Sequence, residues 1–168
     1  PLGWRNVPLA DLLTRSLGMP VYLDQVVRGL ALAESMFGAA RDLDDFIEMW
    51  VGNVVGVAIV KDGSVQSGTS GASGMIAHFP TGDAQGNHCE CGRVDCLEKN
   101  INDIGLLAGA QKLGLVGDRI DVRDVLQLAE GGNQLARGLL SEKGEIAGEA
   151  AAAIAKSRID ITTPPWAT

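Results

Sequence analysis

The chain of 168 residues is poor in aromatic side chains, in positive charge and in long apolar runs. Three tryptophans, three phenylalanines and one tyrosine leave little material for stacking nucleic-acid bases. Fourteen Lys and Arg residues against 21 Asp and Glu residues give a formal net charge of −7, which excludes a uniformly basic nucleic-acid surface on this chain. The sequence has no apolar run of bilayer length and no charged-then-apolar leader, so we expect a cytoplasmic protein without a membrane segment.

Cysteine is also scarce, and the three cysteines crowd into one short segment as Cys89, Cys91 and Cys96. An odd number of cysteines cannot all pair within the chain, which argues against a disulfide framework. The crowding instead favours a metal site or reactive thiols in a reducing compartment. Because no initiating methionine precedes Pro1, we expect a piece of a longer protein.

The apolar pattern predicts a mixed α/β sheet domain. Helices are expected over residues 8–17, 25–37, 104–113, 121–130 and 134–157, with Asp121 as an N-cap. Strands are expected over residues 20–23, 46–50 and 54–60, the last continuing through Lys61-Asp62-Gly63 into a hairpin. Residues 68–95 read as a long loop, and a loop of this length in a compact domain needs something to hold it.

Four potential metal ligands lie in this loop or directly after it, in the pattern H-x10-C-x-C-x4-C: His78, Cys89, Cys91 and Cys96. One imidazole and three thiolates form a donor set that tetrahedral zinc prefers. Four protein ligands leave no open position, so we expect a structural zinc ion that pins the loop. His88 is a rival imidazole donor, although its adjacency to Cys89 makes shared chelation awkward. The alternative is that the cysteines are reduced and half-buried core residues.

The segment 89–98, C-E-C-G-R-V-D-C-L-E, resembles the C-x-C-G-x-x-G-C-x-E signature of the ROK family of repressors and sugar kinases, with Asp95 in place of a glycine. Residues 68–78 resemble the family's G-A-S-G-x-x-G-E-x-G-H stretch. The resemblance implies a partial actin-like, ribonuclease-H-like α/β sugar-kinase fold with zinc bracing a sugar site. Residues 1–168 would then be a fragment of the effector and dimerisation domain, without the N-terminal helix-turn-helix of repressor members and without the start of the N-terminal lobe.

Two departures from the family pattern concern kinase chemistry. Where family kinases carry an Asn-Asp pair whose aspartate is the base toward the sugar hydroxyl, this chain has Gln25 and Val26, and valine accepts no proton. Asp24 is near, but we expect its carboxylate to point elsewhere. The glycine-rich phosphate turn of the kinases is replaced by residues 52–56, G-N-V-V-G, which we interpret as a strand start. We therefore expect no kinase activity and no catalytic residue.

The resemblance also implies a partly altered sugar site. Glu98 and His78 match residues that contact sugar hydroxyls, and Gln25 retains amide chemistry in place of asparagine. Met75 replaces the family's other sugar-binding glutamate, which predicts a changed ligand. Arg28 is best read as a surface charge, with a salt bridge to Asp24 or a contact with an acidic ligand as alternatives.

Taken together, these residues favour the effector-sensing part of a ROK-type transcriptional regulator. The expected partners are a sugar or sugar-phosphate effector, DNA through a missing N-terminal domain, and further copies of the chain in a homodimer or tetramer. The alternatives are an active ROK sugar kinase, acting on a hexose or N-acetylhexosamine, and a ligand-free dimerisation scaffold. The zinc ion is the one cofactor expected.

Overall fold

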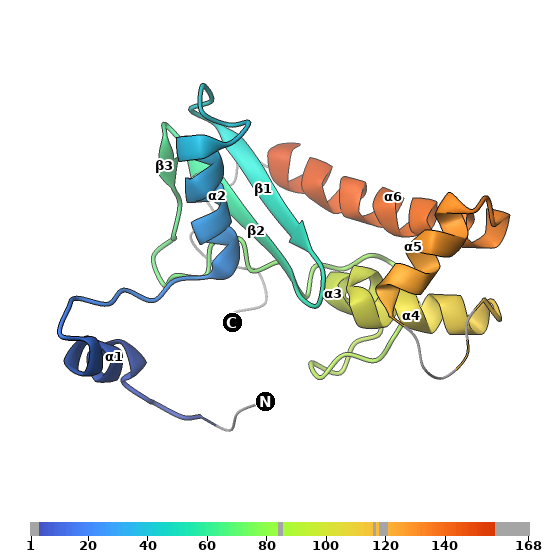
Figure 1. Cartoon of the computed structure of the whole chain (residues 1–168), viewed down its shortest axis with the longest axis horizontal. Coiled ribbons are helices and arrows are strands. Elements are labelled where there is room, and N and C mark those ends of the chain that lie inside the picture. Colours follow the sequence, from blue (N-terminus) through green and yellow to red (C-terminus); the bar gives the residue numbers. More distant parts are fainter. Residues whose placement is uncertain (1–3, 84–85, 116, 118–120, 157–168) are drawn as a thin grey trace.

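The computed structural model describes residues 4–83, 86–115, 117 and 121–156. The elements are α1 (Leu9–Leu17), α2 (Val26–Phe37), β1 (Phe46–Val51), β2 (Val55–Lys61), β3 (Ser64–Val65), α3 (Leu97–Ile101), α4 (Asp103–Lys112), α5 (Val122–Glu130) and α6 (Gln134–Lys156). Figure 1 shows the described strands gathered in one sheet, with helices on either side of it. This confirms the predicted α/β domain.

The sheet is an antiparallel hairpin of β1 and β2, extended by the short strand β3 in the order β1-β2-β3. β1 pairs with β2 from Phe46↔Val60 to Val51↔Val55. The hairpin predicted at Lys61-Asp62-Gly63 is confirmed, since Asp62 and Gly63 both have positive φ (51° and 69°) between the paired residues Lys61 and Ser64. Two successive left-handed residues match the right-handed twist of the flanking strands.

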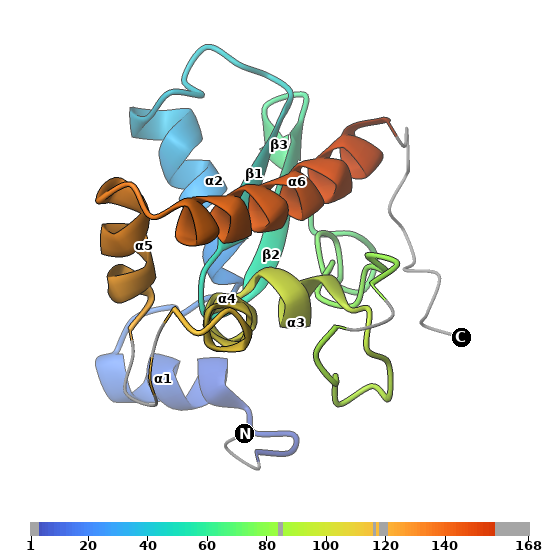
Figure 2. The same ribbon diagram turned by 90° about the vertical axis from the view of Figure 1, so that its right-hand side faces the viewer.

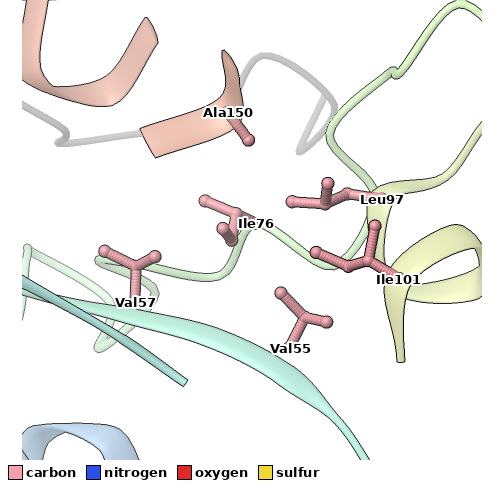
Figure 3. Packing of buried hydrophobic residues seen from close by; sticks show 6 residues of the cluster. All are labelled: Val55, Val57, Ile76, Leu97, Ile101 and Ala150. Carbon is pink, nitrogen blue, oxygen red and sulfur yellow. The ribbon is translucent and has the colours of Figure 1, made fainter. Parts of the chain in front are cut away.

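β2 is the central strand of the sheet, and helices cover both of its faces. Val55 and Val57 point to one face, where they pack with Ile76 and with α3 and α6 (Figure 3). Ala58 and Val60 point to the other face, where they pack against α2. Turning the molecule shows α6 crossing in front of the strands and α2 on their far side (Figure 2). The result is a helix-sheet-helix sandwich around a strand that reads as a continuous apolar run, as doubly covered strands do.

A separate apolar cluster joins the C-terminal helices. Leu106 and Ala110 of α4 pack with Val125 of α5 and Leu139 of α6. Asp121 caps α5 as predicted, and Asp124 completes a capping box by accepting from the Asp121 N–H at 3.0 Å. In the described part of the chain, no helix is long and apolar enough to cross a bilayer, α6 included.

The N-terminal region departs from prediction in one respect. α1 forms as expected and ends at Gly18 in a left-handed conformation, but it contributes no buried residue and lies apart from the sheet (Figure 1). The predicted strand over residues 20–23 is wrong, because this extended segment pairs with no strand of the described chain. Tyr22 is 91% accessible and Leu23 is 54% accessible, whereas Val21 is half-buried. An extended segment becomes a strand only where a partner satisfies its ladder.

Candidate metal centre and its surroundings

A short antiparallel pairing brings His78 to the cysteine segment. The N–H of Leu97 donates to the carbonyl of Phe79 at 2.9 Å, and the N–H of Glu98 donates to the carbonyl of Ala77 at 3.0 Å. Pro80 and Cys96 form an isolated bridge between the same two segments. His78 therefore lies directly opposite the point where Cys96 leads into α3.

The other two cysteines lie on a tight turn. The N–H of Gly92 donates to the carbonyl of Cys89 at 2.9 Å, and the N–H of Cys89 donates to the carbonyl of Arg93 at 2.8 Å. Gly92 has φ +89°, in the left-handed region that side-chain-bearing residues rarely adopt. This turn explains why glycine stands between Cys91 and Arg93: it reverses the chain so that both sulfurs face the same side.

Four side chains converge on one point: His78, Cys89, Cys91 and Cys96, whose ligand atoms all lie within 4.8 Å of one another. The Nδ1 atom of His78 is 3.4 Å from Sγ of Cys89, and Sγ of Cys91 is 3.4 Å from Sγ of Cys96. Tetrahedral zinc with its usual bond lengths places two sulfurs about 3.8 Å apart and a sulfur and a nitrogen about 3.6 Å apart. The donor set and its spacing therefore fit a zinc ion without rearrangement of the backbone.

The thiols differ in their electrostatic environments. Burial, reinforced by hydrogen bonds with the neighbouring thiols, raises the pKa of Cys96 to about 12. A hydrogen bond from the backbone N–H of Arg93, followed by one with the Cys96 thiol, lowers the pKa of the exposed Cys91. Without a cation, the buried Cys96 therefore retains its proton while Cys91 ionises more readily. A dication at the centre of the cluster supplies the charge that three adjacent thiolates require.

The structure does not favour the two alternatives to this ligand set, His88 as the imidazole donor and the cysteines as core residues. His88 is exposed and is not a member of the cluster. Cys91 is exposed as well, which does not fit the alternative in which all three thiols are half-buried core residues.

Sequence reasoning missed two ion pairs that brace the cysteine turn. Arg93 donates twice to Asp95, with both nitrogen–oxygen distances at 2.8 Å. Lys99 of α3 donates to Glu90 at 2.9 Å, and this hydrogen bond is the largest cause that lowers the pKa of the Glu90 carboxyl. The one available signal was Asp95 itself, the residue that departs from the glycine of the resembled signature.

The residues expected to contact a ligand all adjoin the segment between β3 and His78. The Nε2 of Gln25 donates to the carbonyl of Gly71 at 3.4 Å. Glu98 accepts from the N–H of Val55 at 3.1 Å through Oε2, while its own N–H binds the carbonyl of Ala77. This half-buried carboxylate thus joins α3 to the start of β2, a structural role that the sequence did not indicate.

Val26 stands where the resemblance to family kinases would place the catalytic base. Val26 is the first residue of α2 and is 64% exposed. The Asp24 carboxylate is turned away from this position, because Oδ1 accepts from the N–H of Gln25 at 2.8 Å and pairs with Nη1 of Arg28 at 2.9 Å. Residues 52–54 form the turn between β1 and β2, and Val55 and Gly56 begin β2, one residue after the expected strand start.

Comparisons with known proteins agree with this architecture. A family model described as ROK family matches residues 1–162. The xylose repressor of Caldicellulosiruptor bescii is 30% identical over 155 residues, covering 86% of this chain and 39% of that protein. The crystal structure of a ROK family transcriptional regulator, a homologue of Escherichia coli Mlc, matches with a TM-score of 0.79 at 29% identity, over 90% of this chain and 40% of that one.

Sugar kinases of the same family are also among the matching structures. A ROK family glucokinase from Streptomyces griseus, solved with glucose and AMPPNP, gives a TM-score of 0.80 at 25% identity, over 91% of this chain and 54% of that one. The chain spans about two fifths of the length of its curated relatives. Its fold is a partial actin-like sugar-kinase fold with a His/Cys cluster that fits the zinc site of such proteins. The chain belongs to the ROK family.

Proposed function

We propose that this chain is the effector-sensing part of a ROK-type transcriptional regulator that has no sugar-kinase activity. Residues 1–168 would form part of a larger effector and dimerisation domain, and DNA binding would belong to a helix-turn-helix segment outside them. The similarity to a xylose repressor and to an Mlc homologue supports the regulator class. The separation from the kinases rests on residues of this chain.

The observation that carries the proposal is Val26 at the first position of α2. Phosphoryl transfer to a sugar hydroxyl needs a positioned proton acceptor, and the valine side chain has none. Asp24 is the nearest carboxylate along the chain, but it is engaged in an ion pair with Arg28. The turn before β2 also lacks the closely spaced glycines with which family kinases let backbone N–H groups approach phosphates.

An activity assay tests this part of the proposal directly. The full-length protein is incubated with ATP, magnesium and a panel of hexoses and N-acetylhexosamines, and ADP release is measured beside an authentic ROK glucokinase. We expect release no faster than the sugar-free background. ADP formation at enzyme-like rates that depends on one of the sugars would refute the absence of kinase activity and favour the kinase alternative.

We further propose that the metal is one structural zinc ion per chain, held by His78, Cys89, Cys91 and Cys96. A zinc ion held by these four residues would supply a crosslink and no chemistry, because protein ligands would fill all of its positions. Elemental analysis of the full-length protein should find about one zinc per chain, and the Cys91→Ser variant should lose most of it. His88→Ala is the matched control, since that imidazole is exposed outside the cluster and should leave the zinc content unchanged.

The regulatory mechanism follows from linkage. A ligand that binds one lobe arrangement or dimer arrangement more tightly than another shifts the equilibrium between them, and so moves attached DNA-binding segments. Thermal-shift screening against sugars separates this sensor from a ligand-free scaffold, since a ligand at 100 times its Kd adds about 2.7 kcal/mol of stability. A full-length protein without a helix-turn-helix segment would remove the support for the regulator class.

A further inference from the structure

The guanidinium of Arg28 is the most buried cationic group of the described chain for which an exposure is given, with only 6% of the residue accessible. It pairs through Nη1 with Asp24 at 2.9 Å and donates through Nη2 to the carbonyl of Gly71. Its Nε atom is buried and has no hydrogen-bond partner among the described residues. A guanidinium carries five N–H donors, and charged groups this deeply buried are ordinarily fully paired.

The positive charge of Arg28 also lies at the N-terminal end of α2, where the helix dipole disfavours it. Arg28 lies in the first turn of α2, where the partial positive charge of the helix dipole favours acidic side chains and anions. That first turn contains no acidic residue, and the N-cap residue Gln25 makes no side-chain capping hydrogen bond. Val26 and Val27 occupy the first two positions, so the uncapped end of α2 and the buried guanidinium add two positive contributions at one place.

Asp24 is a weak counter-charge for this arrangement. Its side chain is 57% exposed, so water screens its attraction for Arg28 and ordering it costs side-chain entropy. Besides this ion pair, Asp24 is held by a hydrogen bond from the N–H of Gln25 at 2.8 Å, and an anion with stronger bonds to Arg28 would displace its exposed carboxylate into solvent. An anion in its place would gain both the guanidinium and the N-terminal amides of α2.

We propose that the ligand bound at the N-terminal end of α2 is an anionic sugar derivative, a sugar phosphate or a sugar acid, whose acidic group replaces Asp24 on Arg28. The inference rests on the proposed effector-sensing function and names the chemical class of the effector. Gln25 and the carbonyl of Gly71 then hold the guanidinium side of the site in place. Val26 presents no carboxylate to repel the incoming anion.

Binding measurements on the full-length protein with matched sugar pairs test the proposal. Titration calorimetry compares glucose with glucose 6-phosphate and glucuronate, N-acetylglucosamine with its 6-phosphate, and xylose with xylonate. At least one anionic member should bind about 10- to 100-fold more tightly than its neutral partner, the range that charge-assisted hydrogen bonds supply. Arg28→Gln should abolish that ratio, whereas Arg123→Gln, which removes an exposed arginine of α5, should preserve it.

Asp24→Asn provides a second test in a variant whose altered side chain is exposed and which keeps Arg28 itself. Because the competing carboxylate is gone, this variant should bind the anionic sugar several-fold more tightly than the parent protein does. Unchanged or weaker binding by Asp24→Asn would overturn the proposal. Tighter binding of the neutral members would overturn the anionic class and leave the sensor function standing, whereas stabilisation by none of the sugars would remove both.

Discussion

The substitution Gly74→Ala tests how the segment that carries His78 is attached to the sheet. Gly74 is buried, has φ +79° and lies against β2, where the N–H of Val57 donates to its carbonyl at 3.2 Å. A Cβ atom added at this position would lie 1.7 Å from the carbonyl oxygen of Val57 and 2.7 Å from its carbonyl carbon. Both contacts are with backbone of the central strand, so the segment itself has to move.

Gly71→Ala is the matched control because it isolates the backbone strain from the clash. Gly71 lies in the same segment with φ +72°, but nothing lies within 4 Å of its added Cβ. A left-handed alanine costs roughly 1–2 kcal/mol at either position. At Gly74 the overpacking adds about 1–3 kcal/mol, and loss of the hydrogen bond from Val57 adds about 0.5–1.5 kcal/mol.

Thermal unfolding of the two variants in the full-length protein measures the difference. Gly74→Ala should be less stable than Gly71→Ala by about 2–4 kcal/mol, which in a domain of 150–250 residues lowers Tm by a further 4–16 °C or so. The zinc content of the Gly74 variant should also fall, since His78 follows closely in the chain. Equal Tm values for the two variants would refute the close packing of this segment on β2.

Three further outcomes follow from the same contacts. Removal of the metal by a strong chelator should lower Tm and raise amide hydrogen exchange in residues 86–96 while leaving exchange in β2 unchanged; uniform loss of protection would contradict a local crosslink. Leu97→Ala, at a fully buried position beside Cys96, should destabilise the protein by about 2–5 kcal/mol in denaturant unfolding, whereas Leu135→Ala at an exposed position should cost far less. Asp121→Ala removes the capping box of α5 and should cost about 0.5–2 kcal/mol; no loss would mean that the cap is idle.

Local rules predicted most of the fold because they depend on nearby residues. The turn at Asp62 and Gly63 follows from the conformational freedom of those two residues, and the cap at Asp121 follows from one side chain and its adjacent N–H groups. The candidate donor set of His78, Cys89, Cys91 and Cys96, whose convergence the structure shows, was equally predictable, since the chemistry of these side chains does not depend on the rest of the fold.

Features that depend on distant partners were not predictable from local pattern. The apolar run over residues 20–23 has the composition of a strand, but a strand requires a neighbour, and the described chain offers none. The role of Glu98 in accepting from Val55 depends on a contact between α3 and the start of β2 that no local pattern encodes. The sequence predicts that Arg28 is a solvated charge on a helix, but the side chain is buried in the structure and donates to the carbonyl of Gly71, a residue distant in the chain.

Zinc binding in place of apolar burial would explain why the loop between β3 and α3 can have so polar a sequence. Among the described residues between β3 and α3, the buried apolar side chains are Ile76, Cys89 and Cys96, and two of these three belong to the proposed zinc site. Burial of one such side chain is worth about 1.5–3 kcal/mol, whereas zinc binding to small structural sites is worth about 10–16 kcal/mol. From the described part of this loop the apolar clusters around β2 take Ile76 and the partly buried Phe79, and neither is a proposed zinc ligand. The proposed zinc ion would therefore fix the conformation of the loop between β3 and α3, whereas packing of Ile76 and Phe79 places this loop against the sheet.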